Sequence, residues 1–466
     1  MKKIILIYIF IFSIFSCKIQ EKADFAIQNV TVIDVADEVS KSGMTVLITG
    51  TRISKVDNTH NTKLSENVKI IDGSGKFLIP GLWDMHAHPY VEDNPTNVIG
   101  KRFMSIYIAN GITSVRVMLG SSIQQGLREE INSGKLIGPR MIIASPFASG
   151  SAPGRSDTSG VSNPGKGRQF VQKGYRTGAD FVKLGSYIPR NVYFAMADEA
   201  KNQGIPFAGH LPYSIRGIEA SDTGQLTLEH QFSILIPCSL KEDEITANLM
   251  DVLPTYRNRL KVYANIHYNE QKARQFFTHL LDNSTYVCPT IVVWDEFANK
   301  DKDQLFSDPR FNLMPSDIRE RWKLSCENFA DEEVKADMRR MNSKTHHIIS
   351  EMNKVGIKIL AGTDEGMPYV FTGFSLHKEL ELLVKCGLTP MEALQTATIN
   401  AAECVGKLDS LGTIEEGKIA DLILLDANPL LSVDNTKRIN SVFYNGECID
   451  RVALDKILDN IDKLVH

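Results

Sequence analysis

Histidine, lysine and aspartate side chains stand at the ends of five short apolar segments of this chain. In chain order they are His86 and His88, Lys183, His210, His230 and Asp364. Residues two apart on a strand face the same side, so the first two imidazoles can hold one ion. Imidazole and carboxylate groups are common ligands of Zn²⁺. If the fold brings these ends together, the sequence therefore predicts a functional site there, in which His86 and His88 could hold an ion.

The segments belong to a longer alternation of apolar, β-branched runs with helical stretches, from residue 77 to about residue 387. The eight runs predicted as strands are Phe77–His88, Ile112–Met118, Met141–Pro146, Phe181–Gly185, Ile205–His210, Leu226–Gln231, Tyr286–Val293 and Ile357–Asp364. Between them, stretches such as Asn191–Gln203 and Thr345–Val355 have apolar residues three and four apart, as helices do. Five of these helices are expected to end at a glycine with a left-handed backbone, namely Gly111, Gly178, Gly204, Gly224 and Gly356.

Periodicity alone leaves two α/β folds open, a (β/α)₈ TIM barrel and an open, doubly wound sheet. In a barrel, the C-terminal ends of all strands converge on one face, where active sites are built. The side chains at the ends of the first and eighth runs can meet only if those runs are neighbours. We therefore predict an α/β (β/α)₈ TIM barrel over residues 77–404.

The predicted barrel is flanked by two strand-rich ends, residues 23–76 and 405–450. Neither end is long enough for a convincing core of its own, so we expect one small composite β-sandwich built from both. Two charged, helical insertions near residues 239–284 and 294–343 follow the sixth and seventh strands. Because they emerge on the side of the pocket, they are expected either as solvated excursions or as a lid.

The composition excludes several classes of protein. With 43% hydrophobic and 23% charged residues, 32 Gly and 18 Pro, the 466-residue chain is neither disordered nor fibrous. A formal net charge of −4 without a basic stripe gives no footprint for binding nucleic acid. Six scattered cysteines form no metal-binding spacing and are expected mostly as buried thiols: Cys238, Cys288, Cys326, Cys386, Cys404 and Cys448.

Residues 1–17 have the pattern of a secretory signal. Two lysines precede the apolar run Ile4–Phe15, which is too short to span a bilayer, for which about 20 residues are needed. The ending Ile14–Cys17 resembles a bacterial lipobox, in which Cys17 becomes the lipidated first residue of the mature chain. We expect an extracytoplasmic, membrane-anchored lipoprotein, in the periplasm or at the cell surface, that meets the membrane only through this lipid.

The full set of residues is similar to the amidohydrolase superfamily. The hallmark is the segment Gly81–His88 with its H-x-H pair, after which the lysine, the two histidines and the aspartate follow in the family's order. Segments Phe77–Leu82 and Gly417–Leu422 resemble the flanking strands, so the similarity spans nearly the whole chain after the signal. The surroundings of Lys183 resemble the imidazolonepropionase-related branch, which includes prolidase-like enzymes.

This resemblance implies a centre of two divalent ions, Zn²⁺ first among them. The implied ligands are His86, His88 and Asp364 for the more buried ion, His210 and His230 for the more exposed ion, and Lys183 as the bridge. The lysine would be carboxylated by CO₂ on its terminal nitrogen. Burial lowers the pKa of a lysine, which makes neutral amine available for that reaction, and two cations stabilise the resulting carbamate.

The implied reaction is hydrolysis of a C–N amide bond by a metal-bridging hydroxide. Small substrates such as dipeptides, N-acyl amino acids and cyclic amides suit such a centre. The expected catalytic residues are Asp364, which moves the proton, His230 and Tyr213. Arg116, Arg155 and Tyr213 are candidate substrate-binding residues, with ion pairing or loop packing as their alternative roles.

Two other functions stay open. One is a mononuclear aminohydrolase (deaminase) of the same superfamily, which usually carries Glu three residues after the third histidine and lacks the bridging lysine. This chain has Tyr213 at that place and retains Lys183. The other is a non-catalytic surface lipoprotein. The expected partner is a small-molecule substrate, and a homo-oligomer is left open.

Overall fold

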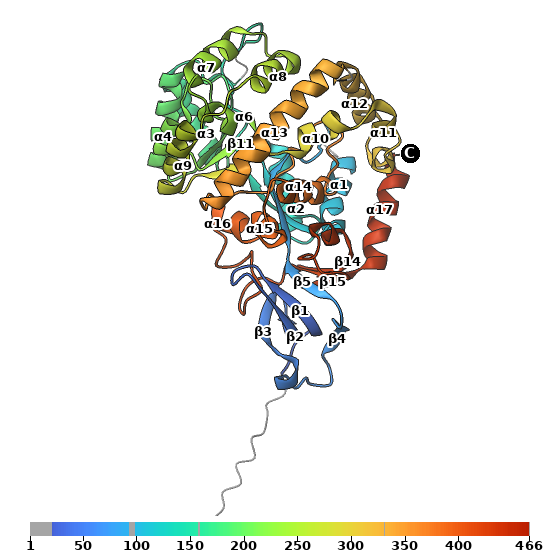
Figure 1. The fold of residues 1–466 in the computed structure, drawn as a ribbon. Helices are drawn as coiled ribbons and strands as arrows, with labels where there is room; N and C mark the ends of the chain where they lie inside the picture. Colours follow the sequence, from blue (N-terminus) through green and yellow to red (C-terminus); the bar gives the residue numbers. More distant parts are fainter. Residues whose placement is uncertain (1–20, 93–97, 157–158, 330, 466) are drawn as a thin grey trace, which may run out of the picture.

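The computed structural model describes residues 21–92, 98–156, 159–329 and 331–465. They form an α/β body with a smaller, sheet-rich part at one end (Figure 1). The predicted signal and Cys17 lie outside the described residues. Within the described ranges, no helix is both long and apolar enough to cross a membrane.

The sheet-rich part is one eight-stranded sheet that takes strands from both ends of the chain. Its strands are β1 (Phe25–Asp34), β2 (Val39–Thr49), β3 (Arg52–Asn58), β4 (Lys69–Asp72), β5 (Phe77–Pro80), β13 (Leu422–Leu425), β14 (Ile439–Tyr444) and β15 (Glu447–Asp450). Strand β5 joins the two halves, because it pairs in parallel with β1 and antiparallel with β13. Where the sequence suggests a sandwich, hydrogen bonding links the strands of both ends into one continuous sheet.

The α/β body contains seven short parallel strands. They are β6 (Leu82–Ala87), β7 (Ile112–Val117), β8 (Arg140–Ile143), β9 (Val182–Leu184), β10 (Phe207–Gly209), β11 (Thr227–Glu229) and β12 (Tyr286–Cys288). Ala144 bridges the first three to the run of β9, and Ile359 bridges the eighth run to β12. The amide of Asp364 then donates to the carbonyl of His86, at 2.7 Å, which brings the eighth run to β6. The arrangement is TIM-barrel-like.

The first predicted strand is in fact two strands that meet at Gly81. Its amide donates to the carbonyl of Asp421 in the sheet-rich part, at 2.8 Å. A Cβ at this position would lie 2.1 Å from Oγ1 of Thr113, so only glycine fits the crossing. The chain therefore leaves the sheet as β5 and enters the barrel-like body as β6, and the boundary lies four residues later than the sequence suggests.

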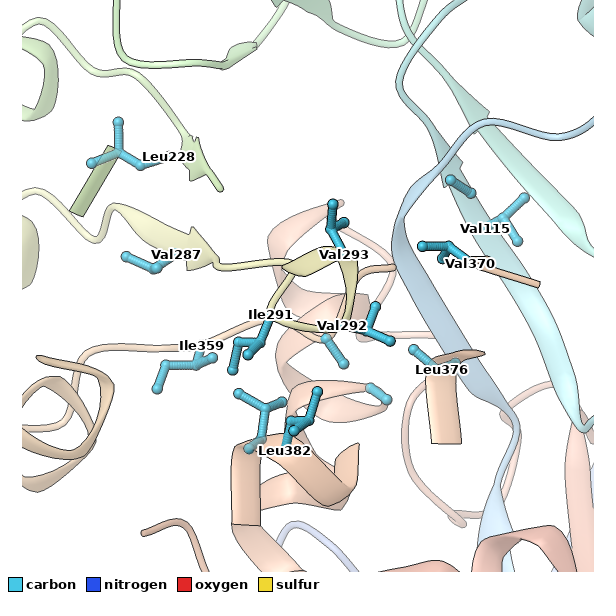
Figure 2. Packing of buried hydrophobic residues seen from close by; sticks show 14 of the residues in the cluster. Val115, Leu228, Val287, Ile291, Val292, Val293, Ile359, Val370, Leu376 and Leu382 are labelled. Atoms are coloured by element: carbon cyan, nitrogen blue, oxygen red, sulfur yellow. The ribbon is translucent and has the colours of Figure 1, made fainter. Parts of the chain in front are cut away.

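The predicted seventh strand, Tyr286–Val293, was also wrong in part. The strand ends at Cys288, and helix α10 (Val292–Asn299) begins within the same apolar run. Glu379 of α14 (Ser375–Lys385) accepts hydrogen bonds from the amides of Ile291, at 3.0 Å, and Val292, at 2.8 Å. Figure 2 shows these two residues packed beside Leu382 of α14, so the run turns into a helix that stays buried.

The remaining helices surround the strands and form the insertions. They are α1 (Val98–Ala109), α2 (Ser122–Asn132), α3 (Pro164–Arg176), α4 (Arg190–Gln203), α5 (Gly217–Asp222), α6 (Phe232–Leu235), α7 (Glu242–Asp251), α8 (Tyr256–Ala264), α9 (Glu270–Asp282), α11 (Lys302–Phe306), α12 (Ser316–Phe329), α13 (Glu332–Lys354), α15 (Pro390–Thr396), α16 (Ile399–Cys404) and α17 (Arg451–Val465). All five glycines predicted to end helices have positive φ, from 66° at Gly204 to 91° at Gly224. Helix α17, which packs against α1, was not foreseen.

Candidate active site

A cavity of about 290 Å³ opens at the C-terminal ends of the parallel strands. All six side chains that the sequence analysis selects as metal ligands line it: His86, His88, Lys183, His210, His230 and Asp364. The remaining walls are largely apolar and aromatic, and include Phe147, Phe232 and Trp294. The fold thus gathers side chains from across 279 positions of sequence into one small pocket.

Asp364 lies at the centre of the histidine group. Its Oδ1 is 3.1 Å from Nε2 of His88 and 3.3 Å from Nε2 of His86, and its Oδ2 is 3.7 Å from Nδ1 of His230. Nε2 of His210 faces Nε2 of His230 at 3.1 Å. Two neutral imidazoles with facing lone pairs repel each other, and a shared cation relieves that repulsion.

The second ring nitrogen of three histidines is held by a neighbour. Nδ1 of His86 is 2.7 Å from Oε2 of Glu229, and Nδ1 of His210 is 2.8 Å from the Ser186 hydroxyl. Nδ1 of His230 is 3.0 Å from the Thr290 hydroxyl. Such contacts fix the orientation of ligating histidines in metal sites, and here they leave Nε2 of each ring facing the other side chains of the site.

Among the residues that the structure describes, Nε2 of His86 and Nζ of Lys183 are buried in the site without a hydrogen-bond partner. Buried polar atoms are nearly always satisfied in native proteins, and exceptions call for an ion or another group. The oxygen and nitrogen atoms of His86, His230 and Asp364 also lie close enough together to hold one metal ion. The donor set therefore fits a divalent metal.

The electrostatics of the cavity favour the metal-binding forms of these groups. Burial, together with neighbouring positive groups, lowers the pKa of His210 well below its usual value and that of His230 to about 3. Burial opposes ionisation of Asp364, but interaction with the imidazoles outweighs it and lowers the pKa of this carboxyl well below its ordinary value. Burial also lowers the pKa of Lys183 to about 8. At neutral pH His210 and His230 are therefore neutral and Asp364 is ionised.

The backbone is unusual at two of the candidate metal ligands. His230 has φ of 70° and Asp364 has φ of 56°, a left-handed conformation that is costly for residues with a Cβ. Such strain gathers at functional sites. Gly362, two residues before Asp364, permits the close approach to β6, because a Cβ there would lie 2.5 Å from Cys288 Sγ and 2.7 Å from His86 Cβ.

Arg116 lies behind the site rather than in it. Its side chain is 2% exposed, and NH2 is 2.7 Å from Oε1 of Glu229. Nε donates to the carbonyl of Met85 at 2.6 Å, and NH1 donates to the Thr227 hydroxyl at 3.0 Å. The guanidinium is thus engaged in a buried ion pair with Glu229, whose carboxylate also contacts His86. The structure therefore corrects the expectation that Arg116 binds the substrate.

Tyr213 and Arg155 are likewise absent from the described lining of the cavity. Tyr213 is 4% exposed, and its hydroxyl lies 2.6 Å from the hydroxyl of Tyr263, which does line the cavity. Arg155 is exposed, and its backbone closes a turn with Ala152. Tyr213 therefore supports a wall residue, and Arg155 contributes no described contact to the metal-ligand group.

The sequence analysis missed the residues of α8 that cover the cavity. They are Tyr256, Arg259, Leu260 and Tyr263. These residues are spaced three, four and seven positions apart, which places them on one face of a helix. This periodicity is the feature of the sequence from which they could have been found. Trp294 of the second insertion lines the same cavity. Both insertions therefore contribute to the cover of the pocket, as the lid interpretation requires.

Fold and site together define a TIM-barrel-like α/β protein with a histidine- and lysine-lined cavity at its strand ends. The sequence matches the Amidohydrolase family over residues 77–449. Because this match covers most of the chain, the protein belongs to the amidohydrolase family.

Individual relatives are distant. The chain is 38% identical over 89 residues to the imidazolonepropionase of Thermoplasma volcanium, which covers 18% of this chain and 21% of that protein. It is 23% identical over 411 residues to an adenine deaminase of Desulforamulus reducens, covering 87% of this chain and 55% of the deaminase. The matches thus span at most about half the length of these curated relatives. Among solved structures, a Xaa-Pro dipeptidase with bound methionine in its active site is similar in fold, with a TM-score of 0.66, 23% identity, and coverage of 91% of this chain and 99% of that one.

Proposed function

We propose that the protein is a metal-dependent hydrolase that cleaves a C–N amide bond of a small substrate. The observation that carries this proposal is Lys183, whose Nζ is buried in the cavity without a hydrogen-bond partner. A lysine in this position, in one cavity with four histidines and a carboxylate, is suited to carboxylation by CO₂ and to bridging two cations. The proposal also takes the eight parallel segments as one closed (β/α)₈ barrel. The bridges of Ala144 and Ile359 and the backbone hydrogen bond from Asp364 to His86 support it.

The proposed centre holds two divalent ions, with Zn²⁺ as the first candidate. The ligands would be His86, His88 and Asp364 for one ion, His210 and His230 for the other, and carboxylated Lys183 for both. When bound, such ions polarise a carbonyl group and lower the pKa of water, so that a nucleophile is available at neutral pH.

The chain's own groups supply the remaining steps. Asp364, ionised and within 3.1 Å of His88 Nε2, is placed to take a proton from the attacking water and to pass it to the leaving nitrogen. Glu229 and Ser186 keep two imidazoles oriented through their outer nitrogens. The aromatic walls exclude bulk water, which strengthens every charge interaction inside.

Metal content and turnover of purified protein test the proposal together. We expect about two ions per chain and hydrolysis of members of a panel of dipeptides, N-acyl amino acids and cyclic amides. Lys183→Ala should lose metal and turnover while it keeps the fold, whereas Lys201→Ala, an exposed lysine on α4, should change neither. Full activity in Lys183→Ala would sink the bridging role.

A mononuclear deaminase is the second candidate, and the similarity to an adenine deaminase favours it. It requires about one ion per chain and release of ammonia from a purine- or pyrimidine-like ring. Two ions without ammonia release would exclude it, and a metal-free, inert protein would leave only a binding role.

A further inference from the structure

Arg259 is a cation in the wall of the cavity. It lies on α8, lines the same pocket as the metal-ligand group, and its Nε is buried without a hydrogen-bond partner. In the described part of the chain, no carboxylate forms an ion pair with it. Arg257, two residues earlier on the same helix, contrasts with it, because its NH2 pairs with Asp331 at 2.9 Å and Glu333 at 3.5 Å.

The surroundings of Arg259 are aromatic hydroxyl groups. Its guanidinium carbon lies 5.2 Å from the centre of the Tyr256 ring. Burial acts to lower the pKa of Arg259, but electrostatic interaction with four tyrosines raises this pKa above its ordinary value. The guanidinium therefore stays charged. The four tyrosines are Tyr263, Tyr213, Tyr187 and Tyr256. The hydroxyl of Tyr187 is itself buried without a partner.

A partly buried guanidinium without a counter-ion is costly, since a buried charge is tolerated when it is paired and hydrogen-bonded. Arg116 shows how this chain satisfies a structural arginine, through a buried carboxylate and two further acceptors. Arg259 has no such set and faces the pocket. An anion that enters with the substrate would supply a partner, and the guanidinium fork is matched to a carboxylate.

We propose that Arg259 binds the free carboxylate of the substrate and thereby restricts it to N-acyl amino acids or dipeptides. This rests on the proposed function. The carboxylate would be held under α8 while the amide carbonyl lies at the metal-ligand group, and Phe147, Phe232 and Trp294 would contact an apolar side chain. Water adds across the C–N bond, the acyl carbon taking hydroxyl and the nitrogen taking hydrogen, and the carboxylate is unchanged. A cavity of about 290 Å³ suits a ligand of this size.

The test compares each substrate with its C-terminal carboxamide, in metal-loaded protein. The panel is N-acetyl amino acids and dipeptides with apolar side chains, followed by turnover and by calorimetric binding. The variants are Arg259→Met, Arg259→Lys and, as a matched control on the same helix, Arg257→Met. We expect wild type to prefer the carboxylate over the carboxamide by about 10- to 100-fold, as for loss of a charge-assisted hydrogen bond. Arg259→Met should remove that preference, Arg259→Lys should retain part of it, and Arg257→Met should keep it.

The two readouts separate this proposal from the proposed function. Binding that requires both the carboxylate and Arg259, but without turnover, supports the anchor and contradicts the hydrolase. Turnover without preference for the carboxylate contradicts the anchor and leaves the hydrolase intact. A preference that survives Arg259→Met overturns the anchor, because the carboxylate must then bind elsewhere, for example at the metal ions. Failure of wild type to bind any member of the panel also overturns it.

Discussion

Replacement of Glu229 by Gln should both destabilise the protein and weaken its hold on metal. The carboxylate is fully buried and lies 2.7 Å from NH2 of Arg116 and 2.7 Å from Nδ1 of His86. The variant leaves the Arg116 charge buried without its counter-charge, which typically costs about 3 to 5 kcal/mol. It also loosens the orientation of His86, and loss of such a contact costs about 10- to 100-fold in metal affinity.

Urea unfolding measures the first effect and competition with a chelator for Zn²⁺ measures the second. The control is Glu219→Gln, which breaks the partly exposed pair between Glu219 and Arg190 and should cost about 1 kcal/mol or less. The pKa of Glu229 is lowered well below its ordinary 4.5, because interaction with Arg116 and His86 outweighs burial. Its stabilisation is therefore present above pH 4.5 and is lost as the pH falls through the lowered pKa, so the two proteins should converge in acid.

The double variant Glu229→Gln/Arg116→Met separates the two effects. It removes the stranded charge, so most of the lost stability should return. Metal affinity should stay low, because no carboxylate holds His86 Nδ1. The reasoning is refuted if Glu229→Gln unfolds at the wild-type urea concentration, or if the double variant regains wild-type metal affinity.

Three further outcomes are expected. Carboxylation of Lys183 in metal-free protein, followed by ¹³C NMR with labelled bicarbonate, should increase as the pH rises through about 8, the lowered pKa of this amine, since only the neutral form reacts; a flat profile from pH 6 to 9 would contradict it. Gly362→Ala should lower both the urea midpoint of unfolding and the metal affinity, because the new Cβ would lie 2.7 Å from His86 Cβ. The control Gly126→Ala, whose Cβ would meet no described atom within 4 Å, should be neutral or stabilising by up to about 1 kcal/mol. Equal behaviour of the two variants would disprove the packing argument. Cys17→Ser should move the protein from the membrane fraction to the soluble exported fraction on immunoblots, and unchanged membrane association would exclude the lipid anchor.

The convergence of the six candidate metal ligands on one cavity could be predicted from sequence because each lies at or near the end of an apolar run. In parallel strands that position also fixes the location in space, at the shared carboxyl edge. Lys183 and Asp364 needed no knowledge of loops or side-chain contacts to be placed. The strands of the two chain ends could likewise be predicted from their alternating apolar and polar residues. This alternation does not show whether the strands join in one sheet or in two.

The contacts around that group could not be predicted, because they join residues far apart in sequence. Arg116 lies near the end of an apolar run, as a residue that faces the pocket would. Only the position of Glu229, 113 residues later, shows that its guanidinium is paired behind the site. Helix α8 has a recognisable face from Tyr256 to Tyr263, but periodicity does not tell what that face covers. The apolar run Tyr286–Val293 is compatible with a strand and with a buried helix. The hydrogen bonds from the amides of Ile291 and Val292 to Glu379 accompany the change from strand to helix within this run.

The shared sheet has a consequence for the order of folding. Leu78 in β5 pairs with Leu424 in β13, so one edge of β5 has no neighbour until the ribosome has made nearly the whole chain. At about 5 to 20 residues per second, that wait lasts roughly 20 to 70 s. An exposed strand edge attracts other chains. This topology therefore leaves one edge of β5 open to mispairing until the C-terminal strands have been made.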